Sequence, residues 1–129
     1  MVADTLWLKR FTAHPAGFPA LDPIRHLPAP SSLDEPLFTD IGAQFNRRKM
    51  LDQTIKLWAA TLTEKDLPHI LHYTNMKGVT AHKQFSKLIL HFFNHQTHHR
   101  GQATTLLSQA GIDVGVTDLI ALIEDEIDA

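Results

Sequence analysis

The sequence predicts an all-α fold, a helical bundle with one small β-hairpin. Apolar residues recur at helical spacing in several separate segments, with helix start and stop signals between them. Only residues 70–80 are instead β-branched and aromatic. A chain of 129 residues with 43% hydrophobic residues has room for one domain of this kind, which we expect to span residues 1–129.

The first predicted helix begins near Val2 and stops at His14-Pro15-Ala16-Gly17, because proline and glycine end helices. Five prolines then lie between residues 15 and 30. We therefore expect no regular structure there but an ordered crossover loop, which a bundle needs when successive helices are not simple antiparallel neighbours.

A long amphipathic helix is predicted next, with Ser32 as its N-cap and its end near Leu62. Two acidic residues follow Ser32 in the predicted first turn, where the helix dipole favours them. The polar run at residues 63–66 ends the pattern. Inside this helix, Arg47-Arg48-Lys49 is the only tight basic run, and we interpret it as a solvated helix face.

The C-terminal half begins with the predicted hairpin, whose turn lies around residues 75–78. A helix from about His82 to Ala110 follows, and Gly111 suits a left-handed C-terminal cap. Thr117-Asp118 then predicts the start of a final helix, with Ile127 as its last apolar position.

Composition excludes several classes of protein. Twelve Lys and Arg against fourteen Asp and Glu give no positive field for a nucleic acid. No stretch approaches the roughly 20 apolar residues of a membrane span, and the start of the chain does not read as a signal peptide. Since cysteine is absent, any metal site must use His, Asp or Glu. We expect a cytoplasmic protein that binds neither nucleic acid nor a membrane.

The sequence feature that most clearly suggests chemistry is a group of four histidines on the predicted helix from about His82 to Ala110. On a helix they share one face with Leu88 and Leu106, which predicts a position inside the bundle or at its mouth. The four are His91, His95, His98 and His99.

Two pairs in this group have metal-binding spacing. His95 and His99 stand one helical turn apart, and His91 and His95 share that spacing. All three cannot hold one ion, because His91 and His99 are roughly 12 Å apart along the axis. A zinc protease would need Glu where Gln96 stands, so that class lacks its general base. The remaining alternative is a set of packed, hydrogen-bonded histidines without a metal.

The stretch "HFFNHQTHHRGQATTLLSQAGID" resembles the signature of the DinB family of metalloenzymes. The similarity extends over nearly the whole chain, through "VADTLWLKRF", "LTEKDL", "YTNMKG" and "DLIALI". It implies a four-helix bundle that carries a divalent metal, commonly zinc or nickel, on three histidines. Two of them correspond to His95 and His99 of H-x-x-x-H-R-G-Q, which makes His91 and His98 supporting or packing residues.

In the family pattern, the third histidine and the first bundle helix would precede Met1, so the resemblance implies an N-terminally truncated bundle. His14, His26 and His72 are the candidate substitutes for the third ligand. The missing helix would uncover apolar residues, namely Leu6, Trp7, Phe92 and the helix around Trp58. We therefore expect a homodimer with Trp7 as an anchor of its interface.

The resemblance also implies a reaction class, a metal-dependent hydrolase or a thiol transferase. Characterised relatives of the latter kind use a low-molecular-weight thiol such as bacillithiol or mycothiol as co-substrate. The sequence names neither the substrate nor a catalytic residue. The alternative is a catalytically silent helical, stress-related protein that acts through dimerisation.

Overall fold

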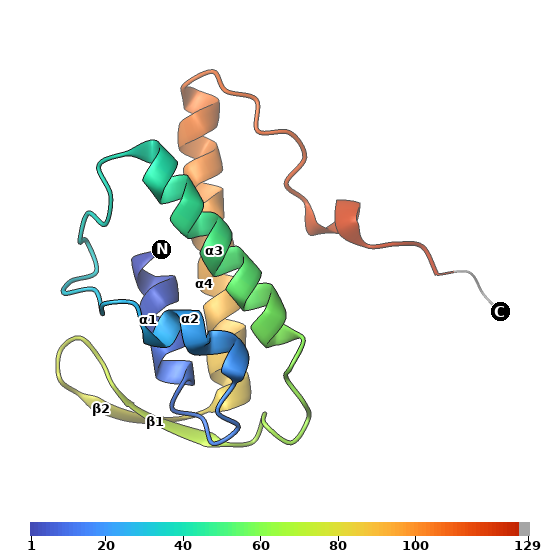
Figure 1. The fold of residues 1–129 in the computed structure, drawn as a ribbon. Helices are drawn as coiled ribbons and strands as arrows, with labels where there is room; N and C mark the ends of the chain where they lie inside the picture. The colour runs from blue at the N-terminus through green and yellow to red at the C-terminus, as the bar shows by residue number, and fades with distance from the viewer. Residues whose placement is uncertain (127–129) are drawn as a thin grey trace. The chain divides into compact units, whose positions relative to one another are not determined.

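The computed structural model describes residues 1–126, so the predicted position of Ile127 lies outside the described part. The described residues form a mainly helical fold with one small antiparallel sheet (Figure 1). In chain order the elements are α1 (Val2–Phe11), a 3-10 helix (Pro19–Leu21), α2 (Asp22–Arg25), α3 (Ile41–Ala59), β1 (Ile70–Thr74), β2 (Thr80–Gln84), α4 (Phe85–Gln109) and a second 3-10 helix (Leu119–Leu122).

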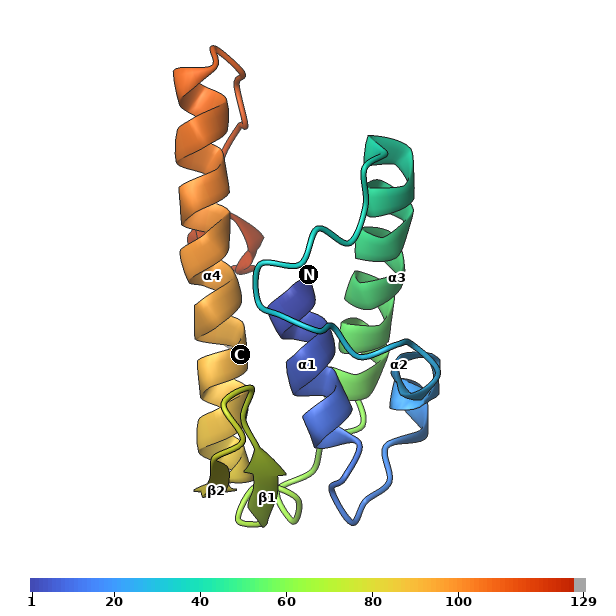
Figure 2. The ribbon, with the colours of Figure 1, turned by 90° about the vertical axis from the view of Figure 1, so that its left-hand side faces the viewer.

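The chain divides into two compact units, Met1–Phe93 and Asn94–Ala129, and the boundary falls within α4. In the first unit, α1 lies between α3 and the first turns of α4 (Figure 2). Its residue Phe11 stacks on Trp58 of α3 at 5.2 Å between ring centroids and meets Phe85 of α4 edge-on at 5.3 Å. An aromatic cluster therefore forms the centre of the core of this unit.

The predicted exposure of apolar residues in this unit is only partly right, because Phe45 and Leu57 of α3, the helix around Trp58, are exposed, whereas other predicted positions are not. Leu6, Trp58 and Phe92 are buried, because α1, α3 and α4 pack around the aromatic cluster. Trp7 is half-buried and meets Tyr73 of the hairpin edge-on at 5.3 Å. The homodimer itself stays a prediction, without the support of an uncovered Trp58 or Phe92.

The proline-rich connection contains more regular structure than predicted. Its 3-10 helix and α2 each carry a proline in the first two positions, where the missing N–H costs no hydrogen bond. Phe18, Leu21 and Ile24 are buried in the core. The prolines thus start short helical turns. The apolar residues between them pack into the core of the first unit and keep the connection in place.

α3 begins later than predicted, at Ile41 rather than near Ser32. The side chain of Asp40 is the N-cap and accepts a hydrogen bond from the backbone N–H of Ala43 at 2.7 Å. Pro36 disfavours helical geometry at the residue before it, which explains why the earlier signal fails.

After α3 the chain turns through a polar segment. Asp66 accepts hydrogen bonds from the backbone N–H and the hydroxyl of Thr63, at 2.8 and 2.9 Å. The backbone hydrogen bond is the main reason why the pKa of the Asp66 carboxyl lies below its ordinary value. The predicted break at residues 63–66 is confirmed.

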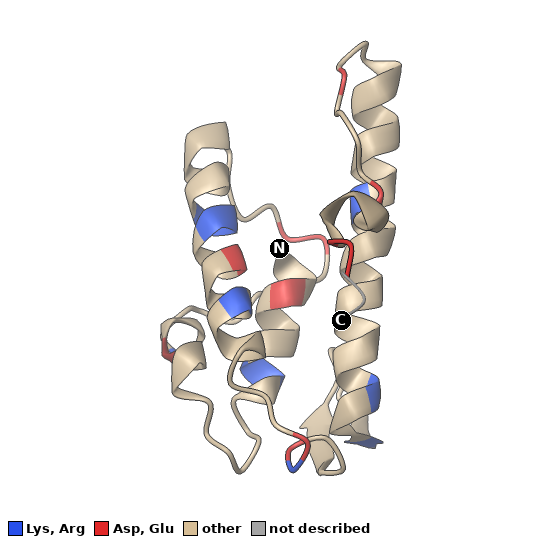
Figure 3. Cartoon of the chain, turned by 90° about the vertical axis from the view of Figure 1, so that its right-hand side faces the viewer, with Lys and Arg blue, Asp and Glu red and all other residues tan. Residues whose placement is uncertain are grey.

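The basic run of α3 is only partly a solvated face. Charged residues of both signs are interleaved along this helix (Figure 3). Arg48 forms an ion pair with Asp4 of α1, whose side chain is 8% exposed, and a second one with Asp52 at 2.7 Å. Burial lowers the pKa of the Arg48 guanidinium, but the hydrogen bonds and attraction to both carboxylates outweigh it and raise the pKa.

The predicted hairpin is confirmed and is longer than expected. Asn75 Oδ1 accepts hydrogen bonds from the backbone N–H groups of Lys77 and Val79, and Gly78 has the positive φ of +77° that the turn requires. Because β2 runs to Gln84, α4 begins at Phe85 and not at the predicted His82.

The end of α4 lies where it was predicted, but the predicted final helix does not form as an α-helix in the described residues. Gly111 takes the left-handed conformation with φ +78° just after α4 ends at Gln109. Between Gly111 and residue 126, the structure has a 3-10 helix at Leu119–Leu122 in place of the predicted helix, and Asp118 makes no side-chain capping bond. Its apolar side chains are exposed, so no packing stabilises a segment too short to be helical alone.

Candidate metal centre

α4 brings His95 and His99 together in the second unit. They occupy positions i and i+4, and their Nε2 atoms are 3.2 Å apart. The ring centroids are 4.4 Å apart and the ring planes make an angle of 71°. The two Nε2 atoms are therefore close enough for one hydrogen bond between the rings or for one shared ion.

This separation can be compared with the geometry of a metal chelate. With metal–nitrogen bonds of about 2.0–2.1 Å, nitrogens 3.2 Å apart subtend an angle of about 100° at the ion. That value is close to the angle of a tetrahedral site. The pair thus fits two positions of a zinc-like coordination sphere without a change of backbone.

Gln102 determines which nitrogen of His99 is available. Its side-chain Oε1 lies 2.8 Å from His99 Nδ1, and a carbonyl oxygen can only accept a hydrogen bond. Nδ1 therefore carries the proton and Nε2 has the free lone pair that a metal needs. This role of Gln102 was not predicted from the sequence, although its i+3 spacing from His99 in the H-R-G-Q motif is a usable signal.

The other two histidines of the group have different surroundings. The ring of His98 lies 5.2 Å from that of His99, so it packs beside one member of the pair. The ring of His91, in the first unit, lies 5.2 Å from that of Trp7. These contacts are consistent with packing roles for both residues.

The expected burial of the histidine face holds only in part. His95 is half-buried, whereas His99 is exposed. Leu88 is buried as predicted, but Leu106 is 67% exposed. His99 and Leu106 are therefore exposed, whereas the predicted burial holds for Leu88 at the start of this face.

The three candidates for a third ligand, His14, His26 and His72, belong to the first unit. His14 is buried, with Nδ1 accepting from the N–H of Ala16 at 3.0 Å and Nε2 donating to the carbonyl of Asp66 at 3.1 Å. Both of its nitrogens are therefore engaged. His72 pairs with His82, and His26 is exposed. Across residues 1–126, no group of three or more His, Cys, Asp or Glu side chains is placed to hold a metal ion.

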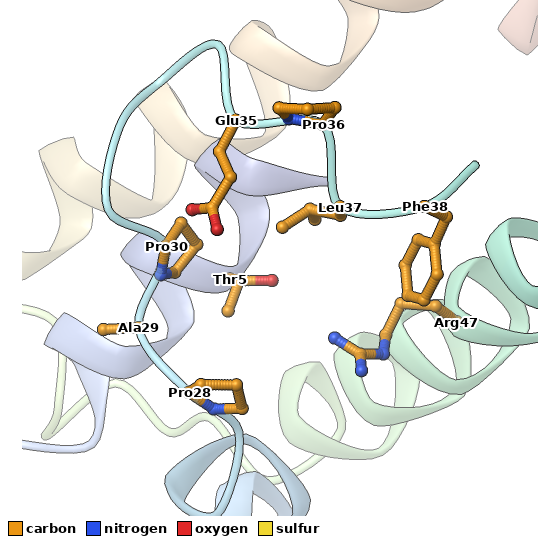
Figure 4. Close-up of a pocket in the computed structure, with 9 residues that line it drawn as sticks. All are labelled: Thr5, Pro28, Ala29, Pro30, Glu35, Pro36, Leu37, Phe38 and Arg47. Carbon is orange, nitrogen blue, oxygen red and sulfur yellow. The ribbon is translucent and has the colours of Figure 1, made fainter.

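A cavity of about 210 Å³ lies in the first unit, between residues 28–38, Thr5 of α1 and Arg47 of α3 (Figure 4). Its two charged residues are already engaged, since Arg47 lies over the ring of Phe38 at 5.2 Å and Glu35 accepts from the N–H of Ser31. It contains no histidine, and it is smaller than the 300–1,000 Å³ typical of small-molecule sites. We therefore place the candidate centre at the histidine pair.

Comparison with known proteins identifies the family. A sequence model of the DinB family matches residues 2–128. No curated protein and no solved structure matches the chain. Within the described residues, no helix is both long and apolar enough to cross a membrane. The family match covers almost every residue, so the chain belongs to the DinB family.

Proposed function

We propose that this DinB family protein binds a divalent metal ion, zinc or nickel, through Nε2 of His95 and Nε2 of His99. The observation that carries the proposal is the 3.2 Å separation of these two atoms, which suits one ion. Family membership supports it, as does the hydrogen bond that His99 Nδ1 donates to Gln102 Oε1. We also propose the four-helix bundle of the family as the complete architecture around this site.

We further propose that the activity is that of a metal-dependent hydrolase or a thiol transferase with a low-molecular-weight thiol as co-substrate. A bound ion would act as a Lewis acid toward water or a thiol at its open positions. His95 and His99 would hold the ion, and Gln102 would keep His99 in the ligand tautomer. Gln96 accepts from Arg100 at 3.4 Å and, as an amide, cannot serve as a general base.

Replacement of either ligand is the direct test of the site. We expect His95→Ala and His99→Ala each to weaken zinc binding at least tenfold in calorimetric titration, because one imidazole alone cannot chelate. Gln102→Ala should weaken binding by about tenfold, as expected when a residue that orients a ligand is removed.

The matched control is His98→Ala, which removes an exposed imidazole of the same helix and should leave the affinity within about twofold. Loss of binding in His91→Ala, with unchanged binding in His99→Ala, would move the site up one turn to the pair His91 and His95. A wild-type protein that retains no metal through dialysis and sediments as a dimer would favour the alternative, a catalytically silent protein that acts through dimerisation.

Zinc affinity should also depend on pH. Because neutral imidazole is the ligand form and its ordinary pKa is about 6.5, protons compete with the ion as the pH falls. We expect the affinity to be constant near pH 8 and to decrease progressively below about pH 6. Titrations at a series of pH values measure this dependence, and an affinity that is unchanged down to pH 5 would rule out histidine ligands.

A further inference from the structure

A second pair of histidines faces each other across the hairpin, in the first unit. His72 of β1 and His82 of β2 are register partners, and their Nδ1 atoms lie 2.6 Å apart. The ring centroids are 4.3 Å apart, with the planes at 70°. The two Nδ1 atoms thus face each other at the distance of a short hydrogen bond between the rings.

The hydrogen-bond pattern of the hairpin explains why these side chains approach so closely. Backbone hydrogen bonds join Asn75 to Val79 at the turn and Phe85 to His69 at the open end. In an antiparallel ladder hydrogen-bonded pairs alternate with non-hydrogen-bonded pairs, so His72 and His82 form a non-hydrogen-bonded pair. The Cα atoms of such pairs are about 4.5 Å apart, which brings their side chains together.

The pair lies on the solvent-facing side of the hairpin. Leu71 is buried at 1% exposure, whereas His72 and His82 are both exposed. Thr74 and Thr80, the next pair on the same face, are exposed as well. An ion from solution can therefore reach both Nδ1 atoms without opening the fold.

We propose that His72 and His82 form a second metal site, which takes a divalent transition-metal cation through the two Nδ1 atoms. Imidazole nitrogen suits zinc, nickel and copper, and the affinity should be highest for copper. A chelate with bonds of about 2.0–2.1 Å needs nitrogens about 3 Å apart. Since the present separation is 2.6 Å, the exposed rings need to move apart by only a few tenths of an ångström.

A metal ion bound at this site would link β1 to β2 through His72 and His82. The opposite face of the hairpin carries Tyr73, which contacts Trp7 of α1 at 5.3 Å. A cation that bridges the strands would therefore stabilise the element that covers Trp7. This proposal rests on the hairpin geometry and not on the proposed function of His95 and His99.

The test uses the full chain with His95→Ala and His99→Ala, so that the first site is absent. Zinc is titrated by calorimetry and by amide nuclear magnetic resonance. We expect about one equivalent to bind, with shifts centred on residues 70–74 and 80–84. Adding His82→Gln or His72→Gln should weaken this binding at least tenfold. The matched control, Thr74→Ala with Thr80→Ala on the same face, should retain it.

The proposal is overturned if the His95→Ala/His99→Ala protein binds no zinc, if the shifts lie outside the hairpin, or if the glutamine variants bind as tightly as their parent. Circular dichroism confirms that each variant is folded before titration. The converse protein, His72→Gln/His82→Gln with His95 and His99 intact, separates the two proposals. It should lose the hairpin equivalent and, if the α4 site exists, retain the other.

Discussion

Trp58→Ala is expected to lower the free energy of unfolding by about 3–5 kcal/mol. Trp58 is completely buried and stacks on Phe11. It also meets Phe18 and Phe92 edge-on at about 6 Å. Alanine would remove these ring contacts and leave a cavity that the surrounding helices could fill only in part.

Urea unfolding followed by circular dichroism measures this loss. Native proteins typically have about 5–15 kcal/mol of stability, so a loss of about 3–5 kcal/mol is a large part of the total and should shift the urea midpoint clearly. Leu57→Ala is the matched control, because the neighbouring side chain is 53% exposed and its loss should cost within about 0.5 kcal/mol. Equal losses in the two variants would contradict the described core.

The variant Trp58→Phe distinguishes the contribution of the ring volume to stability from the cost of the buried indole N–H. Within the described residues, the indole N–H of Trp58 has no hydrogen-bond partner. A buried donor without a partner costs about 1–3 kcal/mol, and phenylalanine removes this cost while keeping much of the apolar volume. We therefore expect Trp58→Phe to cost less than half as much as Trp58→Ala in the same unfolding measurement.

The sequence predicted the end of an element correctly where that end depends on residues close by in the chain. Asn75 and Gly78 specify the turn of the hairpin, and Gly111 specifies the end of α4. Each acts through a hydrogen bond or a φ value within a few residues. The predicted start of α3 was wrong because Ser32 and Asp40 are both residue types that favour the N-cap position. The choice between them depends on Pro36 and on the path of the loop.

The candidate metal pair could be predicted because helical geometry alone brings positions i and i+4 together. His95 and His99 are neighbours in any helix that contains both. The pairing of His72 with His82 depends instead on the register of the hairpin, and a shift by one residue would place them apart. The same limit applies to Arg48, whose contact with Asp4 joins residues from two helices.

Arg48→Gln is expected to lower the free energy of unfolding by about 2–3 kcal/mol. Breaking a buried ion pair typically costs about 3–5 kcal/mol, because one charge then stays in the interior without its partner. The effect should be smaller here, since the side chain of Arg48 is 31% exposed and water can replace part of the interaction. Asp4 is 8% exposed, so its carboxylate cannot gain full hydration.

The matched control changes Asp52, the other carboxylate that forms an ion pair with Arg48. Asp52 is 52% exposed and lies 2.7 Å from Arg48, so Asp52→Asn should cost less than about 1 kcal/mol. The double variant Asp4→Asn/Arg48→Gln should be more stable than the sum of the two single losses implies, because it removes both charges. Unfolding of the four proteins in urea gives the coupling energy, which we expect to be about 1–3 kcal/mol. Additive losses would show that the pair contributes no specific link between α1 and α3, and that the two residues act on stability independently.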